Sequence, residues 1–156
     1  MIEARRSVGA LRPQPAGEES LPAALERMTA LARRTSPVPI ELTLDELPPL
    51  GGMERDIIGI AQEALTNAVS HARAKRIAIR ASAVRAIGFR LSVADDGRGI
   101  AREHRARGFG MTSMQERAER IGASLTIVTA PRAGTEVVLA WEPPSFSIPV
   151  GTNAVR

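Results

Sequence analysis

Two pairs of short apolar segments, each joined by a tight turn, constrain the fold of this chain more than any other feature. In the first pair, RIAIRASA (76–83) and FRLSVAD (89–95) flank a turn near residues 85–88. In the second pair, SLTIVTA and TEVVLAW flank the turn PRAG and occupy residues 124–141. Segments in which apolar and polar residues alternate, joined in pairs by short turns, predict two β-hairpins.

A further strand and three helices complete the predicted elements. The segment IELTLDEL alternates apolar Ile40, Leu42 and Leu44 with polar residues, which indicates a half-buried strand. One helix is predicted from residue 21 onward, with Ser20 as its cap and Pro22 in its first turn. A second is predicted over 53–72 from apolar positions at helical spacing, and a third over 111–121, ended by Gly122. The apolar positions expected in the first helix are Leu21, Leu25, Met28, Leu31 and Ala32.

The order of these elements predicts the fold class. A helix and a strand precede the long helix, and each hairpin follows a helix, so strands and helices do not alternate strictly one by one. We therefore expect an α+β two-layer sandwich with a mixed sheet and helices on one face.

Length and composition limit the classes of protein to consider. A chain of 156 residues corresponds to one domain, and it contains no cysteine for disulfides, thiolate metal sites or a cysteine nucleophile. The start of the sequence lacks a signal-peptide pattern and no apolar run reaches about 18 residues, so we expect a cytoplasmic, soluble domain. The net charge is +4, but the basic residues are scattered and aromatic residues make up 3%, so we expect no nucleic-acid partner.

Three polar residues on the long predicted helix form the first candidate site. Glu63, Asn67 and His71 are spaced four apart and share one face, beside the apolar stripe. A carboxylate and a carboxamide one turn apart offer oxygen ligands to a hard cation. The alternative is an ordinary solvated helix face.

Glycine-rich segments supply the other candidates. In DDGRGI, Asp95 ends a strand and the glycines allow close approach of a ligand, although an ordinary Asp-Gly turn has the same pattern. Gly108-Phe109-Gly110 leads into the helix near residue 111, where backbone N–H groups favour phosphate. Gly134-Thr135 opens the last strand and is equally compatible with a simple hairpin turn.

Taken together and in this order, AQEALTNAVSHA, DDGRGI, GFGM and GTEV resemble the N, G1, G2 and Gly-Thr boxes of the GHKL (Bergerat-fold) ATP-binding superfamily. The resemblance extends over residues 40–142. Within the superfamily the sequence resembles sensor histidine kinases, and QEALTNAVSHA and GFGMTSMQERAERIGASL are similar to the subfamily whose partners are NarL/LuxR-type response regulators.

The resemblance implies roles for particular residues. Asn67 would ligate Mg²⁺ beside the ATP phosphates, Glu63 would polarise the nucleophile or a metal-bound water, and Asp95 would accept the adenine amino group. The remaining nucleotide-binding positions that it implies are His71, Gly97, Gly99, Gly108, Gly110 and Thr135. The implied cofactors are ATP and Mg²⁺.

Two departures from the family pattern concern charge and the phosphoryl acceptor. Many family members have Lys or Arg where this chain has Ser70, so Arg73, Arg102, Arg105 or Arg107 would have to compensate. His71 lies in the N box and His104 in the lid, so neither matches the phosphoacceptor histidine with its usual acidic neighbour, and we expect that group on a separate dimerisation domain.

The same resemblance divides the chain. We expect residues 1–12 to be a remnant of the dimerisation and phosphoacceptor helix, 13–20 a linker, 21–143 the ATP-binding catalytic domain and 144–156 a flexible tail, in a monomer cut from a longer and possibly membrane-anchored protein. Two alternatives stay open: a stand-alone serine kinase of the anti-sigma-factor type, and a non-catalytic binding module with a degenerate pocket.

Overall fold

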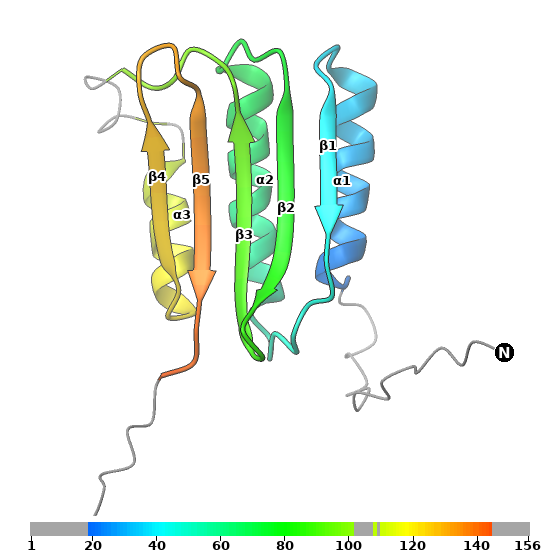
Figure 1. Ribbon diagram of the computed structural model, residues 1–156, viewed down its shortest axis with the longest axis vertical. Helices are drawn as coiled ribbons and strands as arrows, with labels where there is room; N and C mark the ends of the chain where they lie inside the picture. Colours follow the sequence, from blue (N-terminus) through cyan, green and yellow to red (C-terminus); the bar gives the residue numbers. More distant parts are fainter. Residues whose placement is uncertain (1–18, 102–107, 109, 145–156) are drawn as a thin grey trace, which may run out of the picture.

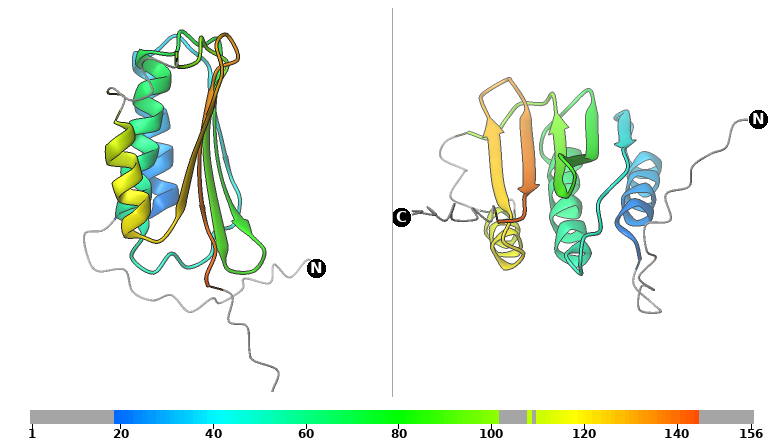
Figure 2. Two further views of the ribbon diagram at one scale, coloured as in Figure 1. Left: turned by 90° about the vertical axis from the view of Figure 1, so that its left-hand side faces the viewer. Right: turned by 60° about the horizontal axis from the view of Figure 1, so that its bottom comes forward.

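The computed structural model describes residues 19–101, 108 and 110–144, which form one β-sheet with helices packed on a single face (Figures 1 and 2). The helices are α1 (Leu21–Thr35), α2 (Glu54–Ser70) and α3 (Met111–Arg120). The strands are β1 (Ile40–Leu44), β2 (Ile77–Val84), β3 (Gly88–Asp95), β4 (Ser124–Thr129) and β5 (Thr135–Trp141). The predicted α+β two-layer sandwich is confirmed.

The sheet has the strand order β1-β2-β3-β5-β4. β1 and β2 are parallel because α2 carries the chain from one to the other across the sheet, whereas the remaining neighbours are antiparallel. The second hairpin adds to the first through β5, so the end of β3 lies beside the start of β5. This pairing places the DDGRGI and Gly-Thr segments at one edge of the sheet.

The hydrophobic core lies between the sheet and the helices. Alternate residues of β3, namely Phe89, Leu91 and Val93, are buried under the apolar face of α2, which contributes Ile60 and Ala64. Full burial of such a side chain stabilises the fold by about 1.5–3 kcal/mol. The regular alternation therefore decides which face of each strand meets the helices.

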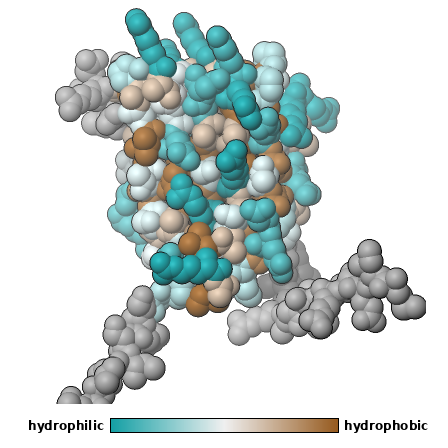
Figure 3. Space-filling model, viewed as in Figure 1, coloured by the Kyte–Doolittle hydropathy of each residue, from teal (hydrophilic) through white to brown (hydrophobic). Residues whose placement is uncertain are grey.

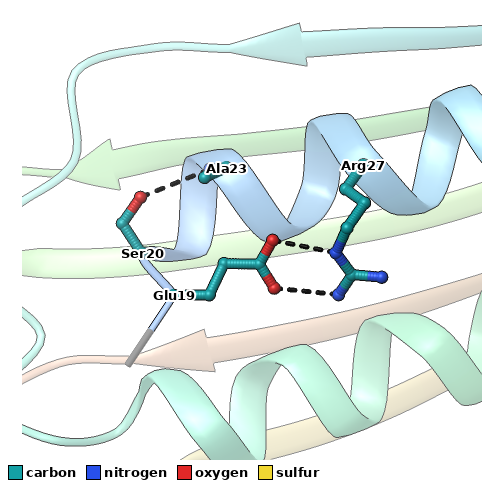
Figure 4. A network of polar contacts seen from close by, with 4 residues as sticks. All are labelled: Glu19, Ser20, Ala23 and Arg27. Carbon is teal, nitrogen blue, oxygen red and sulfur yellow. Dashed lines mark hydrogen bonds and ion pairs between the residues drawn. The ribbon is translucent and has the colours of Figure 1, made fainter. Parts of the chain in front are cut away.

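The N-terminus of α1 has the predicted cap. The backbone N–H of Ala23 donates to the Ser20 hydroxyl at 3.4 Å, and Arg27 forms an ion pair with Glu19 across the first turns (Figure 4). The hydrogen bond from Arg27 lowers the pKa of Glu19, but both side chains are exposed, so this pair adds little stability.

One predicted core position of α1 is wrong. The side chain of Leu31 is 56% exposed, whereas Thr29 is fully buried. Leu21, Leu25, Met28 and Ala32 are buried as predicted and form one stripe along the helix. Leu31 lies one residue, or about 100°, away from Ala32 around the helix and therefore points outside that stripe.

The far face of the sheet is not covered by a helix. Figure 3 looks onto this face, where hydrophilic side chains are interspersed with apolar ones. The strands there present Arg80 and Arg90 beside small residues such as Ala94. Within the described part of the chain, no helix is long and apolar enough to cross a membrane.

Two helix ends differ slightly from the sequence prediction. α2 ends at Ser70 rather than at residue 72, and α3 ends at Arg120, with Gly122 beyond it at φ +67°. The predicted remnant helix (1–12), most of the predicted linker and all but one residue of the predicted tail (144–156) lie outside the described residues.

Candidate functional site

Five of the predicted site residues line a single cavity at one edge of the sheet. The cavity has an empty volume of about 510 Å³, a figure that includes space open to solvent, and lies between the end of α2, the start of α3 and the sheet. The predicted residues that line it are Asn67, His71, Asp95, Gly99 and Thr135. Glu63, Gly97, Gly108 and Gly110 are not part of this lining.

The sheet register explains the composition of the cavity wall. Asp95 of β3 pairs with Thr135 of β5, and Thr135 pairs in turn with Thr129 of β4, so these residues form a polar row across three strands. The next row on the same face is apolar and consists of Val93, Val137 and Ile127. Val93, Val137 and Ile127 all line the cavity. A flat apolar ligand with a polar edge therefore matches this wall.

The Asp95 carboxylate is half-buried at the polar end of the wall. Its Oδ1 atom accepts a hydrogen bond from the backbone N–H of Gly97 at 2.8 Å. Burial raises the pKa of Asp95, hydrogen bonds from the backbone of Gly97 and Thr135 oppose this, and the charge of Asp96 adds to the increase. A carboxylate accepts about four hydrogen bonds, so acceptor capacity remains for a ligand.

The loop after β3 is fastened to the segment that follows α2. The backbone N–H of Arg98 donates to the Ala72 carbonyl at 2.8 Å, and a Cβ atom on Gly97 would overlap that carbonyl, so the close approach requires glycine. Asp96 accepts from the N–H groups of Lys75 and Arg76 at 2.8 and 2.9 Å, which lower the pKa of its carboxyl. Asp95 thus lines the cavity, whereas the adjacent Asp96 holds the loop in place.

The predicted stripe on α2 divides between two places. Asn67 is half-buried and His71 is exposed at the C-cap position, and both line the cavity. Glu63 lies instead beside Gly110, where a Cβ atom would overlap its carboxylate. Gly110 has φ +63° and precedes the first turn of α3, so both its conformation and its contact require glycine.

Gly108 is exposed, and no atom of the described residues outside its chain neighbours lies within 4 Å of the position that a Cβ atom would take. Phe109 and the predicted lid residues 102–107, which include Arg102, Arg105 and Arg107, lie outside the described residues. α3 itself contributes Met111 and Met114 to the cavity. Its N-terminus, with backbone N–H groups without helical partners, therefore borders the site.

A buried carboxylate fixes α3 against α2. Asp56, near the start of α2, is 9% exposed and pairs with Arg120 of α3 at 2.6 Å and with Arg117 at 3.4 Å. The Arg117 guanidinium lies over Gly59, where a Cβ atom would contact it at 2.8 Å. These contacts join the two helices whose ends border the cavity.

Several residues at the site were not singled out from the sequence. Arg98 lines the cavity, whereas Arg73 does not. Its place inside DDGRGI was a usable signal. Met111 and Met114 reach the cavity through tertiary packing, and Thr129 contacts Thr135 without lining the cavity; none of the three had a local signal.

The described residues include no cluster of three or more His, Cys, Asp or Glu side chains that could hold a metal ion alone. A Mg²⁺ site does not need such a cluster, because Mg²⁺ keeps several waters and uses one or two protein oxygens together with substrate phosphates. The Asn67 amide and the Glu63 carboxylate, one helical turn apart, offer such oxygens.

Known proteins resemble this chain both in sequence and in fold. A family model described as "Histidine kinase-, DNA gyrase B-, and HSP90-like ATPase" matches residues 52–145. The chain is 28% identical over 128 residues to the sensor histidine kinase LiaS of Bacillus subtilis (strain 168), an alignment that covers 81% of this chain and 35% of LiaS. It is 34% identical over 130 residues to the nitrate/nitrite sensor protein NarQ of Escherichia coli (strain K12), covering 80% of this chain and 22% of NarQ.

Among solved structures, the ATP binding domain of PrrB from Mycobacterium tuberculosis superposes with a TM-score of 0.62 at 23% identity, covering 81% of this chain and 96% of that one. At this identity the likeness shows the fold. The chain thus spans about a third or less of the length of LiaS and NarQ, but nearly the whole of the PrrB domain.

Proposed function

We propose, starting from the fact that this chain belongs to the histidine kinase-, DNA gyrase B- and HSP90-like ATPase family, that residues 21–143 are the Mg·ATP-binding catalytic domain of a sensor histidine kinase. The reaction would transfer the γ-phosphoryl group of ATP to a histidine on a dimerisation domain, to which residues 1–12 would belong. The pairing of Asp95 with Thr135 above an apolar wall supports this proposal best.

The base end of the cavity suits adenine. Asp95 is an acceptor, and adenine offers an exocyclic amino group where guanine offers a carbonyl oxygen. The apolar row of Val93, Val137 and Ile127 would lie against the flat ring, and Thr135 would support the polar edge. Gly97 and Gly99 would let the backbone pass close to the base.

The phosphate end would lie toward Asn67 and the start of α3. Gly108 and Gly110 would bring backbone N–H groups to the phosphates, and Arg98 would supply positive charge. Asn67 would hold Mg²⁺, which when bound neutralises charge on the phosphates. Glu63, packed against Gly110, would orient the incoming nucleophile, and His71 would border the same region.

The wider pathway follows from the same resemblance. A NarL/LuxR-type response regulator would receive the phosphoryl group, as expected from the helix sequence ERAERIG. NarQ and the signal transduction histidine-protein kinase/phosphatase UhpB of Salmonella typhimurium, 29% identical over 132 residues, are relatives that support this assignment.

Calorimetric titration of the chain with ADP and ATP in Mg²⁺ tests nucleotide binding. We expect saturable binding of both adenine nucleotides, weak binding of GTP, and loss of affinity in Asp95→Asn. Absence of binding by the folded wild-type chain would contradict the proposal and favour a non-catalytic binding module.

Phosphoryl transfer needs a separate experiment in the full-length parent protein. We expect Glu63→Gln to keep ADP affinity but to lose transfer of label from γ-labelled ATP to histidine. Label that appears on serine of a partner protein instead would identify a serine kinase.

A further inference from the structure

Basic side chains that are scattered along the sequence are gathered by the fold at one end of the sheet. Three loops meet there, namely residues 71–76 after α2, residues 96–101 after β3 and residues 130–134 between β4 and β5. We call this surface the basic end, and its exposed basic residues are Arg73, Lys75, Arg76, Arg98 and Arg132. In Figure 3, long hydrophilic side chains project from this end, which lies at the top of the view.

Backbone hydrogen bonds hold the three loops against one another. The N–H of Arg98 donates to the Ala72 carbonyl at 2.8 Å, and the N–H of Arg132 donates to the Arg98 carbonyl at 2.9 Å. Gly99 permits a further close approach, because a Cβ atom there would overlap the Ala130 carbonyl. The arginines of the three loops are therefore carried by one connected backbone framework.

The charges of the basic end are only partly neutralised. Within the described part of the chain, the side chains of Arg73, Arg98 and Arg132 form no hydrogen bond or ion pair. Arg76 does have a partner, since it pairs with Glu41 at 2.6 Å. Three guanidinium groups are thus available to an anionic ligand outside the described chain.

The opposite end of the sheet has acidic side chains and paired arginines. Its acidic residues are Asp45, Glu46, Glu54, Asp56 and Glu142. Arg117 and Arg120 pair there with Asp56, and Arg85 of the β2–β3 turn pairs with Glu142 at 3.7 Å. The described chain is therefore polarised along its strands, and this polarity would orient it toward a negatively charged surface.

Two arginines of the basic end have backbone conformations that favour glycine. Arg73 has φ +51° and Arg132 has φ +63°, a region in which a Cβ atom is unfavourable. Arg85, at φ +57°, shares this conformation but has an ion pair with Glu142. The side chains of Arg73 and Arg132 have no such partner, so no contact within the described fold accounts for arginine at these two positions.

We propose that the basic end docks on an anionic lipid surface. Guanidinium groups bind phosphate through two parallel N–H groups, and a bilayer offers phosphates at any spacing, so docking needs no groove. A stable protein interface has an apolar core, but none of the large exposed apolar residues of the described chain lies on these loops. The loops also contain no Phe, Tyr or Trp to stack on nucleic-acid bases.

Co-sedimentation of the full chain with vesicles tests this docking. We expect binding to mixed vesicles of phosphatidylglycerol and phosphatidylcholine, no binding to phosphatidylcholine alone, and release at about 1 M salt, where the Debye length is about 3 Å. One basic residue near an anionic surface contributes a factor of about five, so Arg73→Gly and Arg132→Gly should each weaken binding about five-fold and together about 25-fold. Because glycine relieves the left-handed conformation, these variants should unfold at the same temperature as the wild type or at a higher one.

Two control variants separate the basic end from a general effect of charge. Arg85→Gly also removes an arginine at positive φ, but at the opposite end, and should leave vesicle binding unchanged. Glu41→Gln releases Arg76 from its ion pair and should strengthen vesicle binding about five-fold, a gain that damage to the fold would not produce.

Three results would overturn the proposal: no binding of the wild-type chain to the mixed vesicles, unchanged binding in the double variant, or an equal loss in Arg85→Gly. Binding of duplex DNA or of poly-glutamate through the same arginines, without vesicle binding, would also overturn it and would assign the surface to a nucleic acid or to an acidic protein. None of these results depends on nucleotide binding in the cavity.

Discussion

Substitution of Asp95 by Asn should lower adenine-nucleotide affinity while leaving the fold intact. The variant keeps one side-chain oxygen, which can still accept from the backbone N–H of Gly97, now 2.8 Å from Oδ1. It replaces the other oxygen by an NH₂ group, which opposes the adenine amino group donor to donor. A hydrogen bond to a charged group contributes about 1.5–3 kcal/mol, so we expect ADP to bind about 10- to 150-fold more weakly.

Calorimetry with ADP on the wild-type chain and on Asp95→Asn measures this loss, and circular dichroism confirms that both are folded. Asp96→Asn provides a matched control because Asp96 is exposed, fastens the loop and does not line the cavity. An Asp95→Asn variant that binds ADP as tightly as the wild type would refute the assignment of this carboxylate to the adenine amino group.

The same variant should show a pH-dependent gain in stability. Burial raises the pKa of Asp95 in the folded state, so the folded protein holds this proton more tightly than the unfolded chain, whose pKa is about 3.9. The favourable contribution of Asp95 is complete below that value and is lost as pH rises through the folded-state pKa. The free energy of unfolding of Asp95→Asn should therefore increase relative to wild type over this interval. Urea unfolding at several pH values would disprove the argument if the difference were constant or reversed.

Three further predictions test the surroundings of the cavity. Gly110→Ala should lower the free energy of unfolding, measured with urea, more than Gly122→Ala does. Both variants place a side chain at positive φ, which costs about 1–2 kcal/mol, but only at Gly110 would the new Cβ atom overlap another side chain. Asp56→Ala should cost about 1–2 kcal/mol of unfolding free energy, while Glu41→Ala, which removes an exposed ion pair, should cost at most about 0.5 kcal/mol. Equal losses would show that burial of the carboxylate does not matter. Asn67→Ala should reduce the factor by which Mg²⁺ increases ATP affinity, measured by titration with and without the metal, and an unchanged factor would contradict its role as a metal ligand.

The elements of the fold were predictable because their signals are local. Alternation in residues 76–83 and 124–130, and Gly122 after the last helix, depend on neighbours within one turn or one strand. The exposed position of Leu31 shows the limit of such signals, because several apolar residues in a row leave the buried face of a helix ambiguous by one position. Only packing against the sheet selected Ala32 over Leu31.

The cavity was predictable in its parts but not in its assembly. Each glycine-rich segment and the Glu63–Asn67 stripe could be found in the sequence, and the family resemblance supplied their grouping. Nothing local indicates that β5 lies between β3 and β4, and that pairing is what joins Asp95 to Thr135. Asp56, 61 residues from Arg117, is a contact of the same kind.

The arrangement of the cavity also makes the fold and the proposed specificity depend on one strand register. Side chains alternate between the faces of a strand, so a shift of one residue in the β3–β5 pair would move Thr135 to the uncovered face and bring Glu136 opposite Asp95. The same shift would remove Val137 and Leu139 from the core. Because burial of these two apolar residues fixes the register, it also fixes the positions of the Asp95 and Thr135 oxygens that would contact the base. The amino acids that stabilise the sheet and those proposed to select the ligand are therefore coupled through the alternation of side chains along a single strand.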